Sequence, residues 1–420
     1  MKIIILFVVL LMGKSARAGI FSYHAEIQPD ILAKSIRGKV TALYLSERSI
    51  QKVSFPLNGL VIDGVQVNRR SITTQILDGQ LIIPLKAILG KQIIEISYHG
   101  IPKRGLVFGP NYVYSVFFTC NWMICDEAPG IKTDFSIDII VPKKFITVAS
   151  GDFISKKSEG KKLVRHSWKE NRPYSSYIFG FAAGEFKSAS SKLGKSELRY
   201  LGVMDDKSSL LQKFKDTARM VKFLEQKSGV PLPHSLYTQV LVPGNVAQEM
   251  TSFSVLGKDF IDPILTNPQE DWAILHELAH QWWGNLLTCK SWEQVWLNEG
   301  ITVFMVAAYK EERWGKAAYD KEMEIIKKRY QRAIDANFDV PLTYKGEYPG
   351  LQLQRAIVYS KGALFMDALR KEMGEEAFWS GVQKYTRTNV GRSVVSQEFQ
   401  KAMEWASSKK LQVIFDKWVY

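Results

Sequence analysis

The chain contains the segment His276-Glu277-Leu278-Ala279-His280, followed by Trp296-Leu297-Asn298-Glu299-Gly300. Two histidines four positions apart on a helix lie one turn above each other on the same face. Both imidazoles can therefore reach one zinc ion, which histidine nitrogens bind at about 2.0–2.1 Å. The alternative is a helix whose histidines are ordinary core or surface residues. The spacing favours the metal site.

Glu299 can supply the third ligand, because a second, antiparallel helix could bring its carboxylate to the same point. Three protein ligands leave the fourth position of zinc open for water, as in catalytic rather than structural sites. Glu277 is rotated about 100° around the helix from His276 and can accept a proton from that water. These segments predict one catalytic Zn²⁺, held by His276, His280 and Glu299, in a hydrolase.

The N-terminus resembles an export signal. Lys2 provides a positive charge, residues 3–12 are apolar, and Ala16-Arg17-Ala18 fits a small-x-small cleavage site. The apolar run is too short to span a bilayer, which takes about 20 residues. We expect cleavage near Ala18 and a mature protein in the periplasm or outside the cell. An uncleaved N-terminal anchor is the alternative.

The chain is basic, with a formal net charge of +14. Much of the charge lies in helical runs such as residues 321–329, which are typical of solvated helix faces. The excess could help the protein associate weakly with anionic envelope lipid or polysaccharide. We expect no nucleic-acid partner, because no recognised binding motif is present. Cys120 and Cys125 are close enough to form a small disulfide loop, which would leave Cys289 unpaired.

Strand-like patterns dominate from residue 19 to residue 192. Alternation or β-branched enrichment is clearest at residues 39–45, 92–98 and 134–141. Helical patterns dominate residues 193–420, after a Lys/Ser-rich stretch near residues 188–196. We therefore expect an α+β multidomain protein with a signal peptide (1–18), an N-terminal antiparallel β domain (19–192) and a mainly α catalytic domain (193–420).

Helices are expected in this second half over residues 208–227, 271–287, 292–312, 317–337, 359–371, 375–386 and 396–407. One strand is expected at Leu236–Val242, so the catalytic half should also contain a short sheet.

The segments 276–285 and 296–300 resemble the gluzincin aminopeptidases, the family of aminopeptidase N and leukotriene hydrolase. Residues 125–129 and 177–186 resemble two further segments of that family's β domain. The resemblance implies a thermolysin-like catalytic domain behind the β domain, one zinc ion and peptide substrates. Many relatives continue with a large helical domain, whereas this chain stops at Tyr420, so we expect a short member with a more open cleft.

The resemblance also implies roles for two residues. Tyr359, within residues 358–363, matches the family tyrosine that donates a hydrogen bond to the tetrahedral oxyanion. Glu249 matches the glutamate that holds the free α-amino group of the substrate. The residues framing Glu249 depart from the family pattern, since Val246 replaces glycine, Gln248 replaces methionine and Met250 replaces asparagine.

The sequence therefore predicts an exported zinc metallopeptidase, with Glu277 and Tyr359 as catalytic groups and Glu249 as the amine anchor of an aminopeptidase. Three alternatives remain open: an open-cleft endopeptidase, a hydrolase acting on a non-peptide substrate, and a catalytically inactive secreted module that binds peptides.

Overall fold

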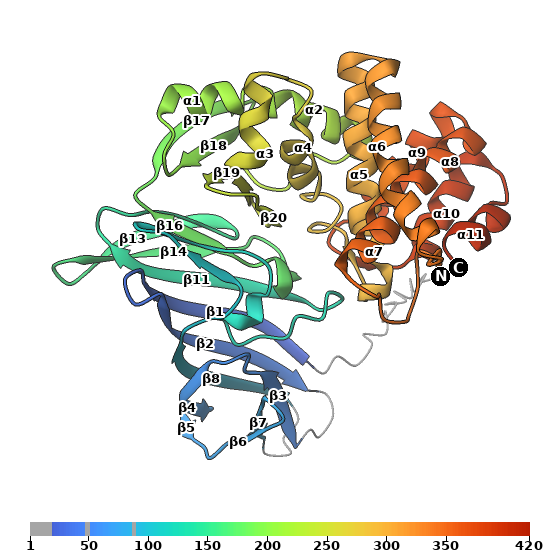
Figure 1. Cartoon of the computed structure of the whole chain (residues 1–420). Coiled ribbons are helices and arrows are strands. Elements are labelled where there is room, and N and C mark those ends of the chain that lie inside the picture. The colour runs from blue at the N-terminus through green and yellow to red at the C-terminus, as the bar shows by residue number, and fades with distance from the viewer. Residues whose placement is uncertain (1–18, 47–50, 86–89) are drawn as a thin grey trace, which may run out of the picture.

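The computed structural model describes residues 19–46, 51–85 and 90–420, and the expected signal peptide lies outside this range. Figure 1 shows β sheets from the first half of the chain, in blue to green, beside a predominantly helical second half in yellow to red. The expected fold class of a β domain followed by a mainly α catalytic domain is confirmed. No helix in the described part of the chain is long and apolar enough to cross a membrane.

The largest sheet of the N-terminal domain has the strand order β13-β14-β11-β1-β2-β8-β4-β5, with β15 paired to β11. Its strands are β1 (Gly19–Asp30), β2 (Ser35–Ser46), β4 (Val61–Val67), β5 (Arg70–Ser71), β8 (Gly90–Gly100), β11 (Lys132–Pro142), β13 (Asp152–Glu159), β14 (Leu163–Lys169) and β15 (Tyr174–Ser175). The strands expected near residues 39–45, 92–98 and 134–141 lie in β2, β8 and β11. The β domain is antiparallel as expected except for one pair among its described strands, because β1 and β11 pair in parallel.

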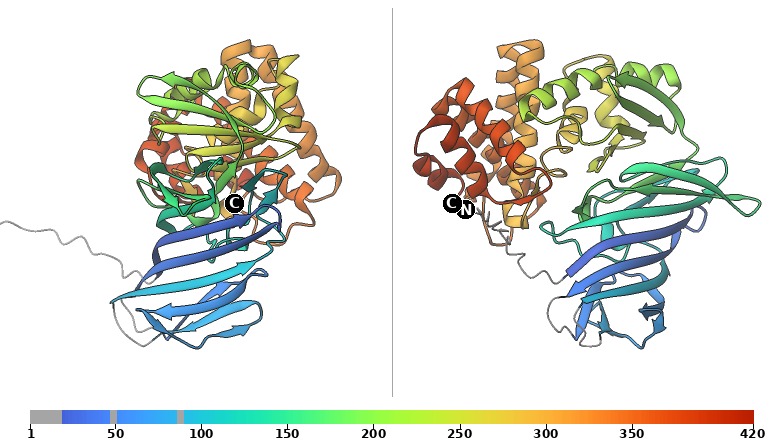
Figure 2. Two further views of the ribbon diagram at one scale, coloured as in Figure 1. Left: turned by 90° about the vertical axis from the view of Figure 1, so that its left-hand side faces the viewer. Right: turned by 180° about the vertical axis from the view of Figure 1, so that it is seen from behind.

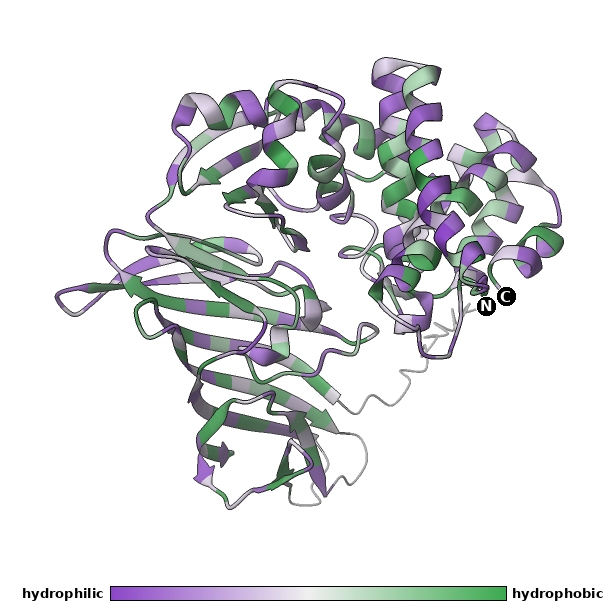
Figure 3. Cartoon of the chain, viewed as in Figure 1, coloured by the Kyte–Doolittle hydropathy of each residue, from purple (hydrophilic) through white to green (hydrophobic). Residues whose placement is uncertain are grey.

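The strands of this sheet form because apolar and polar residues alternate along them, which places the apolar side chains on the buried face. In β1 the buried residues Tyr23, Ala25 and Ile27 occupy every second position, and the residues between them are more exposed. The alternation of apolar and polar residues along these strands is visible in Figure 3. Two smaller sheets complete the domain: β12-β16-β10-β9 and β3-β7-β6. Their strands are β3 (Lys52–Pro56), β6 (Gln75–Leu77), β7 (Gln80–Pro84), β9 (Leu106–Phe108), β10 (Tyr112–Ser115), β12 (Ile146–Ala149) and β16 (Phe181–Gly184).

The catalytic half begins with a mixed sheet of order β17-β18-β19-β21-β20. Its strands are β17 (Lys187–Leu193), β18 (Ser196–Gly202), β19 (Leu236–Val242), β20 (Ala247–Met250) and β21 (Phe253–Gly257). The expected boundary after Lys192 falls inside β17, which pairs with β18 along its whole length. The change of domain therefore lies before Lys187, because the two halves of one hairpin belong to one sheet.

Helices cover the face of this sheet that points away from the β domain, and further helices extend beyond it, as the two views in Figure 2 show. They are α1 (Lys207–Lys213), α2 (Thr217–Ser228), α3 (Lys258–Ile261), α4 (Trp272–Ala279), α5 (Trp296–Trp314), α6 (Lys316–Asp335), α7 (Leu351–Arg355), α8 (Gly362–Met373), α9 (Glu375–Thr388), α10 (Ser396–Ser407) and α11 (Gln412–Trp418). The short pair β22 (Thr288–Cys289) and β23 (Ser393–Val394) links the loop after α4 to the loop before α10.

The helix expected over residues 271–287 is shorter than predicted, since α4 ends at Ala279. Beyond it, the amides of Asn285, Leu286 and Leu287 bond to carbonyls five residues earlier rather than four. Residues 281–287 therefore form a wider, non-helical loop instead of continuing α4.

Two apolar cores meet at the domain junction. One lies among the helices, and the other fills the β domain. The second core also contains Val240, Met250 and Val255 from the catalytic sheet. Because one face of that sheet packs on the β domain and the other on helices, strand β20 is held at the boundary between the domains.

Candidate metal centre and active site

The side chains of His276, His280 and Glu299 meet at one buried point between α4 and α5. The Nε2 atoms of the two histidines lie 3.2 Å apart. Glu299 Oε2 lies 3.5 Å from His276 Nε2 and 3.4 Å from His280 Nε2. Each of the three residues is at most 8% exposed. The structure therefore brings together the three ligands that the sequence predicts.

The two histidine Nε2 atoms and Glu299 Oε2 form a triangle whose sides match those of a zinc site. Two ligands of a tetrahedral ion, each at about 2.0–2.1 Å, lie roughly 3.3 Å from each other. Glu299 Oε2 is buried and has no hydrogen-bond partner among the described residues. Such an atom is costly to bury unless a cation neutralises it. Two nitrogen donors and one carboxylate form a ligand set typical of catalytic zinc.

The loop after α4 fixes the orientation of His280. Its Nδ1 lies 2.9 Å from the Trp283 carbonyl oxygen, to which the ring N–H can donate. The Nε2 lone pair is then free to bind a metal, as is usual for histidine ligands. Gly284 is required here, because it has a φ of 128° and a Cβ on it would lie 2.8 Å from His280 Nδ1.

A second close approach places Tyr359 near Glu299. Gly300 faces Gly362 so closely that a Cβ on Gly300 would lie 2.8 Å from the Gly362 Cα. Tyr359 itself lies in a π-helical turn, Ala356–Lys361, between α7 and α8. Such turns often occur at functional sites, and sequence periodicity gave no sign of this one. The Tyr359 ring stacks on the His276 ring, with ring centroids 6.1 Å apart and an angle of 18° between the ring planes.

Burial raises the pKa of Tyr359 well above its usual value, which keeps the phenol protonated and able to donate a hydrogen bond.

Two further carboxylates lie beside the triangle. Ligand atoms of Glu249, Glu277 and His280 all lie within 4.8 Å of one another. Burial raises the pKa of Glu249 to about 7 and that of Glu277 well above its usual value. Burial alone would lower the pKa of His280, but with no cation between them Glu299 and Glu249 outweigh burial and raise that pKa to about 10. A metal ion bound at His280 Nε2 would take the place of this proton. Three buried carboxylates, Glu249, Glu277 and Glu299, lie close together here, and this favours the binding of a cation among them.

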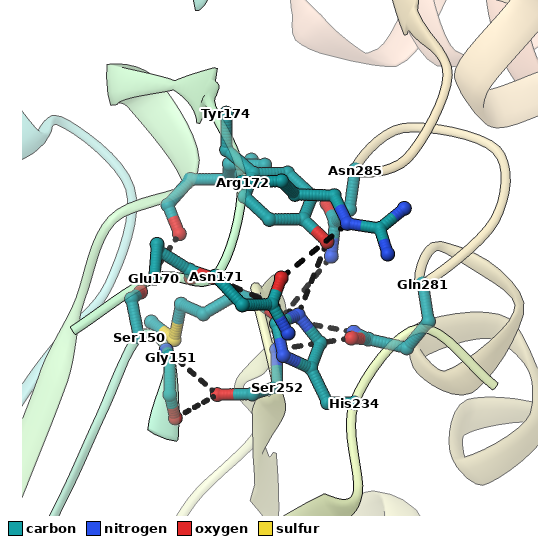
Figure 4. Close-up of polar contacts among 12 residues, drawn as sticks. Ser150, Gly151, Glu170, Asn171, Arg172, Tyr174, His234, Ser252, Gln281 and Asn285 are labelled. Atoms are coloured by element: carbon teal, nitrogen blue, oxygen red, sulfur yellow. Dashed lines mark hydrogen bonds and ion pairs between the residues drawn. The ribbon is translucent and has the colours of Figure 1, made fainter. Parts of the chain in front are cut away.

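Figure 4 shows hydrogen bonds that Ser252 and Gln281 make at the junction of the two domains. Gln281, next to His280, accepts a hydrogen bond from the Ser252 amide (3.0 Å) and donates one to the Met250 carbonyl (2.9 Å). Ser252 Oγ accepts a bond from the amide of Gly151 in the β domain (3.1 Å). The end of α4, the turn after β20 and the β domain are therefore linked.

Sequence reasoning missed Gln281 and Ser252. The only sequence signal was a glutamine directly after the second histidine.

Another cluster is a weaker metal candidate. Cys120, Cys125 and Glu127 also lie close together. However, Cys120 and Cys125 are joined in a disulfide, and Glu127 Oε1 accepts a hydrogen bond from the Cys120 amide at 2.6 Å. The sulfurs are therefore not thiolate donors. Cys289 stays free and buried, as the sequence analysis expected.

Comparisons with known proteins show which proteins this chain resembles in sequence and in fold. Residues 213–418 match the family described as "Peptidase family M1 domain". Residues 213–418 therefore form a peptidase family M1 domain. This M1 chain is 23% identical over 389 residues to "Probable aminopeptidase 2" of Sulfurisphaera tokodaii, covering 86% of the chain and 48% of that relative. It is 27% identical over 316 residues to "Aminopeptidase N" of Lactococcus lactis, covering 70% of the chain and 36% of that relative.

The fold of the M1 chain is shared with a crystal structure described as an M1 zinc metallopeptidase from Deinococcus radiodurans. The TM-score is 0.80 at 21% identity, over 96% of this chain and 93% of that one. At this identity the likeness concerns the fold alone. The M1 chain spans about half, or less, of the curated relatives named above.

Proposed function

We propose that this chain is a zinc-dependent aminopeptidase, which removes N-terminal residues from peptides by hydrolysis. The observation that carries the proposal is a buried cluster of side chains. In it, the ligand atoms of His276, His280 and Glu299 are spaced as zinc requires, and the carboxylates of Glu277 and Glu249 lie next to them. The names of the curated relatives support the same activity. One solved structure of the same fold is described as bound to a Tyr-Ser-Ala substrate, which supports short peptides as ligands.

His276, His280 and Glu299 would hold the metal. When bound, zinc lowers the pKa of water and polarises the carbonyl of the scissile bond. Glu277 lies next to these ligands, and its Oε2 makes no hydrogen bond within the described structure. A metal ion bound beside Glu277 would favour its ionised form, so that this oxygen could take a proton from the attacking water. Glu277 then passes the proton to the departing amine, which completes the general acid–base cycle.

Tyr359 would stabilise the oxygen that becomes negative in the transition state. Its phenol is kept protonated by burial, and its ring is held against His276. A donor fixed in advance pays no reorganisation cost when charge develops, so its contribution falls mainly on kcat.

Glu249 would select free N-termini. Its carboxylate is buried within 4.8 Å of His280, and an ammonium group placed there gains a charge-assisted hydrogen bond. Binding the amine beside the metal ligands sets the first peptide bond, rather than an internal one, at the reacting groups. This favours exopeptidase over endopeptidase action.

The experiment compares peptides with free and acetylated N-termini, using purified protein of measured zinc content and its Glu277→Gln variant. The proposal requires cleavage from free N-termini only and loss of turnover in the zinc-loaded variant. Equal cleavage of both peptides would identify an endopeptidase. Peptide binding without turnover in the wild type would identify an inactive binding module, and turnover of a non-peptide ester alone would identify a different hydrolase.

We also propose that the protein is exported after cleavage near Ala18, to the periplasm or beyond. In support, Lys2, the apolar residues 3–12 and the small-x-small segment ending at Ala18 have the order of an export signal. Removal of Lys2, Lys14 and Arg17 from a chain of net charge +14 leaves 14 − 3 = +11, and this positive charge supports weak association with anionic envelope surfaces. N-terminal sequencing of the protein from fractionated cells tests this. An intact Met1 in the cytoplasmic fraction would contradict it.

A further inference from the structure

Lys132 is the first residue of β11, and its side chain reaches from the β domain to the catalytic half. Its Nζ lies 3.1 Å from the Asn285 carbonyl oxygen and 2.8 Å from Thr288 Oγ1. Both acceptors follow helix α4 in the chain. The same Nζ lies 5.6 Å from the centroid of the Tyr174 ring, in a cation–π contact. One nitrogen atom of the β domain therefore holds two points of the loop after α4.

The hydrogen-bond partners of Lys132 are neutral oxygen atoms rather than carboxylates. Burial lowers the pKa of its amino group to about 7. The ammonium form has three N–H donors and the amine form has two, so either form can donate to both acceptors. Withdrawal of an amino group from water is costly when no opposite charge compensates it. The contact therefore points to a role in orienting the loop.

Asn285 and Thr288 extend this contact along the loop. Thr288 Oγ1, which accepts a hydrogen bond from Lys132, lies 2.8 Å from the Gly284 carbonyl oxygen, to which its O–H can donate. The backbone amide of Asn285 donates to the His280 carbonyl oxygen at 3.0 Å. Gly284 and Asn285 are therefore held between Lys132 on one side and His280 on the other.

The same loop sets the orientation of the His280 ring. His280 Nδ1 lies 2.9 Å from the carbonyl oxygen of Trp283, the residue before Gly284. A shift of that carbonyl would turn the imidazole and move its Nε2 away from His276 and Glu299. Loss of a residue that orients a histidine ligand typically weakens metal binding about 10–100-fold. Contacts that fix residues 283–285 should therefore affect the affinity for the metal.

We infer that Lys132 is a positioning residue, which holds the loop of residues 283–288 against the β domain and so keeps His280 in the orientation that binds zinc. The inference rests on the metal site of the proposed function. The β domain supplies none of the three expected ligands, and through Lys132 it nevertheless sets the affinity of the site.

The first test measures the Kd for zinc by competition with a chelating dye. Lys132→Met keeps an unbranched side chain of similar length and removes the amino group. We expect its Kd to be about tenfold higher than that of the wild type, at the lower end of such effects because Lys132 acts through the loop. The visible absorption of Co²⁺ bound in place of zinc should also change, since it depends on the arrangement of the ligands.

Lys213→Met is the matched control, because it removes another buried lysine from the protein. The partners of Lys213 are Asp205 and Asp262 instead of the loop, and Asp205 keeps Lys258 as a second partner. We expect Lys213→Met to lower the urea midpoint of the metal-free protein and to leave the Kd for zinc unchanged. A merely structural Lys132 would behave in the same way. An unchanged Kd in Lys132→Met, or an equal rise in both variants, would therefore overturn the inference.

Thr288→Val decides the question if Lys132→Met does not fold. It keeps the shape of the side chain and removes the hydroxyl between Lys132 and Gly284. We expect a Kd for zinc about threefold above that of the wild type, as loss of one hydrogen bond should give. The double variant should bind zinc about as weakly as Lys132→Met alone, because both changes break one link. A wild-type Kd in Thr288→Val, or two effects that multiply in the double variant, would contradict this link.

The wild type separates this inference from the proposed function. If the wild type binds zinc and cleaves peptides, and Lys132→Met has the same Kd for zinc, the inference fails and the proposed function stands. If the wild type binds zinc without cleaving peptides, and the Kd still depends on Lys132, the proposed function fails and the inference stands. A wild type that binds no zinc would overturn both.

Discussion

Gly300 and Gly362 bring helix α5 into backbone contact with the start of α8, and this contact sets Glu299 beside Tyr359. A Cβ on Gly362 would lie 2.9 Å from the Gly300 Cα, and the reverse distance is 2.8 Å. No larger residue fits at either position without moving a helix. The proposed oxyanion donor and the third metal ligand therefore owe their proximity to two residues without side chains.

Gly300→Ala should weaken both stability and activity. The added methyl group has no space, and overpacking of this kind costs about 1–3 kcal/mol. We expect a lower denaturation midpoint together with a lower kcat, because α5 and the Tyr359 turn must separate. Gly350→Ala is the control, since a Cβ there meets nothing within 4 Å. Similar behaviour of the two variants would show that the close approach is unimportant.

Tyr359→Phe should reduce kcat while leaving KM almost unchanged. The substitution removes only the phenol O–H, which acts on charge that develops in the transition state. Loss of one such donor typically costs about 10²–10³ in kcat. Tyr348→Phe serves as a comparison, because this tyrosine packs on Phe338 and Tyr344 instead of His276. A normal kcat in Tyr359→Phe would remove this residue from the mechanism.

Removal of the metal should destabilise the catalytic domain as well as abolish turnover. Without an ion, the buried carboxylates of Glu249, Glu277 and Glu299 lack a compensating divalent charge. A ligand that binds only the folded state stabilises that state by about 2.7 kcal/mol when the ligand concentration is about 100 times its Kd.

We therefore expect a chelator to lower the melting temperature and added zinc to restore it. In Glu299→Gln the restoring effect should need a higher zinc concentration. An unchanged melting temperature in the chelated wild type would contradict a site of this affinity.

Glu170 should make stability depend on pH at the domain junction. Burial raises its pKa to about 8, from 4.5, next to His234, whose pKa burial lowers to about 3. The folded state then binds the Glu170 proton more tightly than the unfolded state does. Its contribution to stability is complete below about pH 4.5 and is lost as pH rises towards 8. Tyr174, Asp152 and Arg172 are the other charged or titratable groups that act on it.

The measurement is the urea midpoint of the wild type and of Glu170→Gln at pH 5, 6.5 and 8. Glutamine has no proton to lose, so the difference between the two proteins isolates this one group. We expect the wild type to lose stability relative to the variant as pH rises. Parallel curves would mean that Glu170 titrates normally in the folded state.

Local spacing was enough to predict much of the site. An α-helix fixes the relation between residues four apart, so His276 and His280 had to share a face wherever that helix lay. The same holds for the alternating strands β2, β8 and β11, whose pattern directly reflects which side chains face the core. The expected roles of Glu249 and Tyr359 came instead from the family resemblance, because neither residue is close to the histidines in sequence.

Only the tertiary structure decided where those distant residues meet. The π-helical turn around Tyr359, the early end of α4 and the parallel pairing of β1 with β11 all depend on contacts between segments far apart in the chain. The link from Gln281 through Ser252 to Gly151 crosses the domain junction, and no periodicity in these segments encodes it. The sequence determined the two histidine donors, because their spacing is a property of one helical turn. Packing between helices and between domains determined where Glu299 and the surrounding residues meet them.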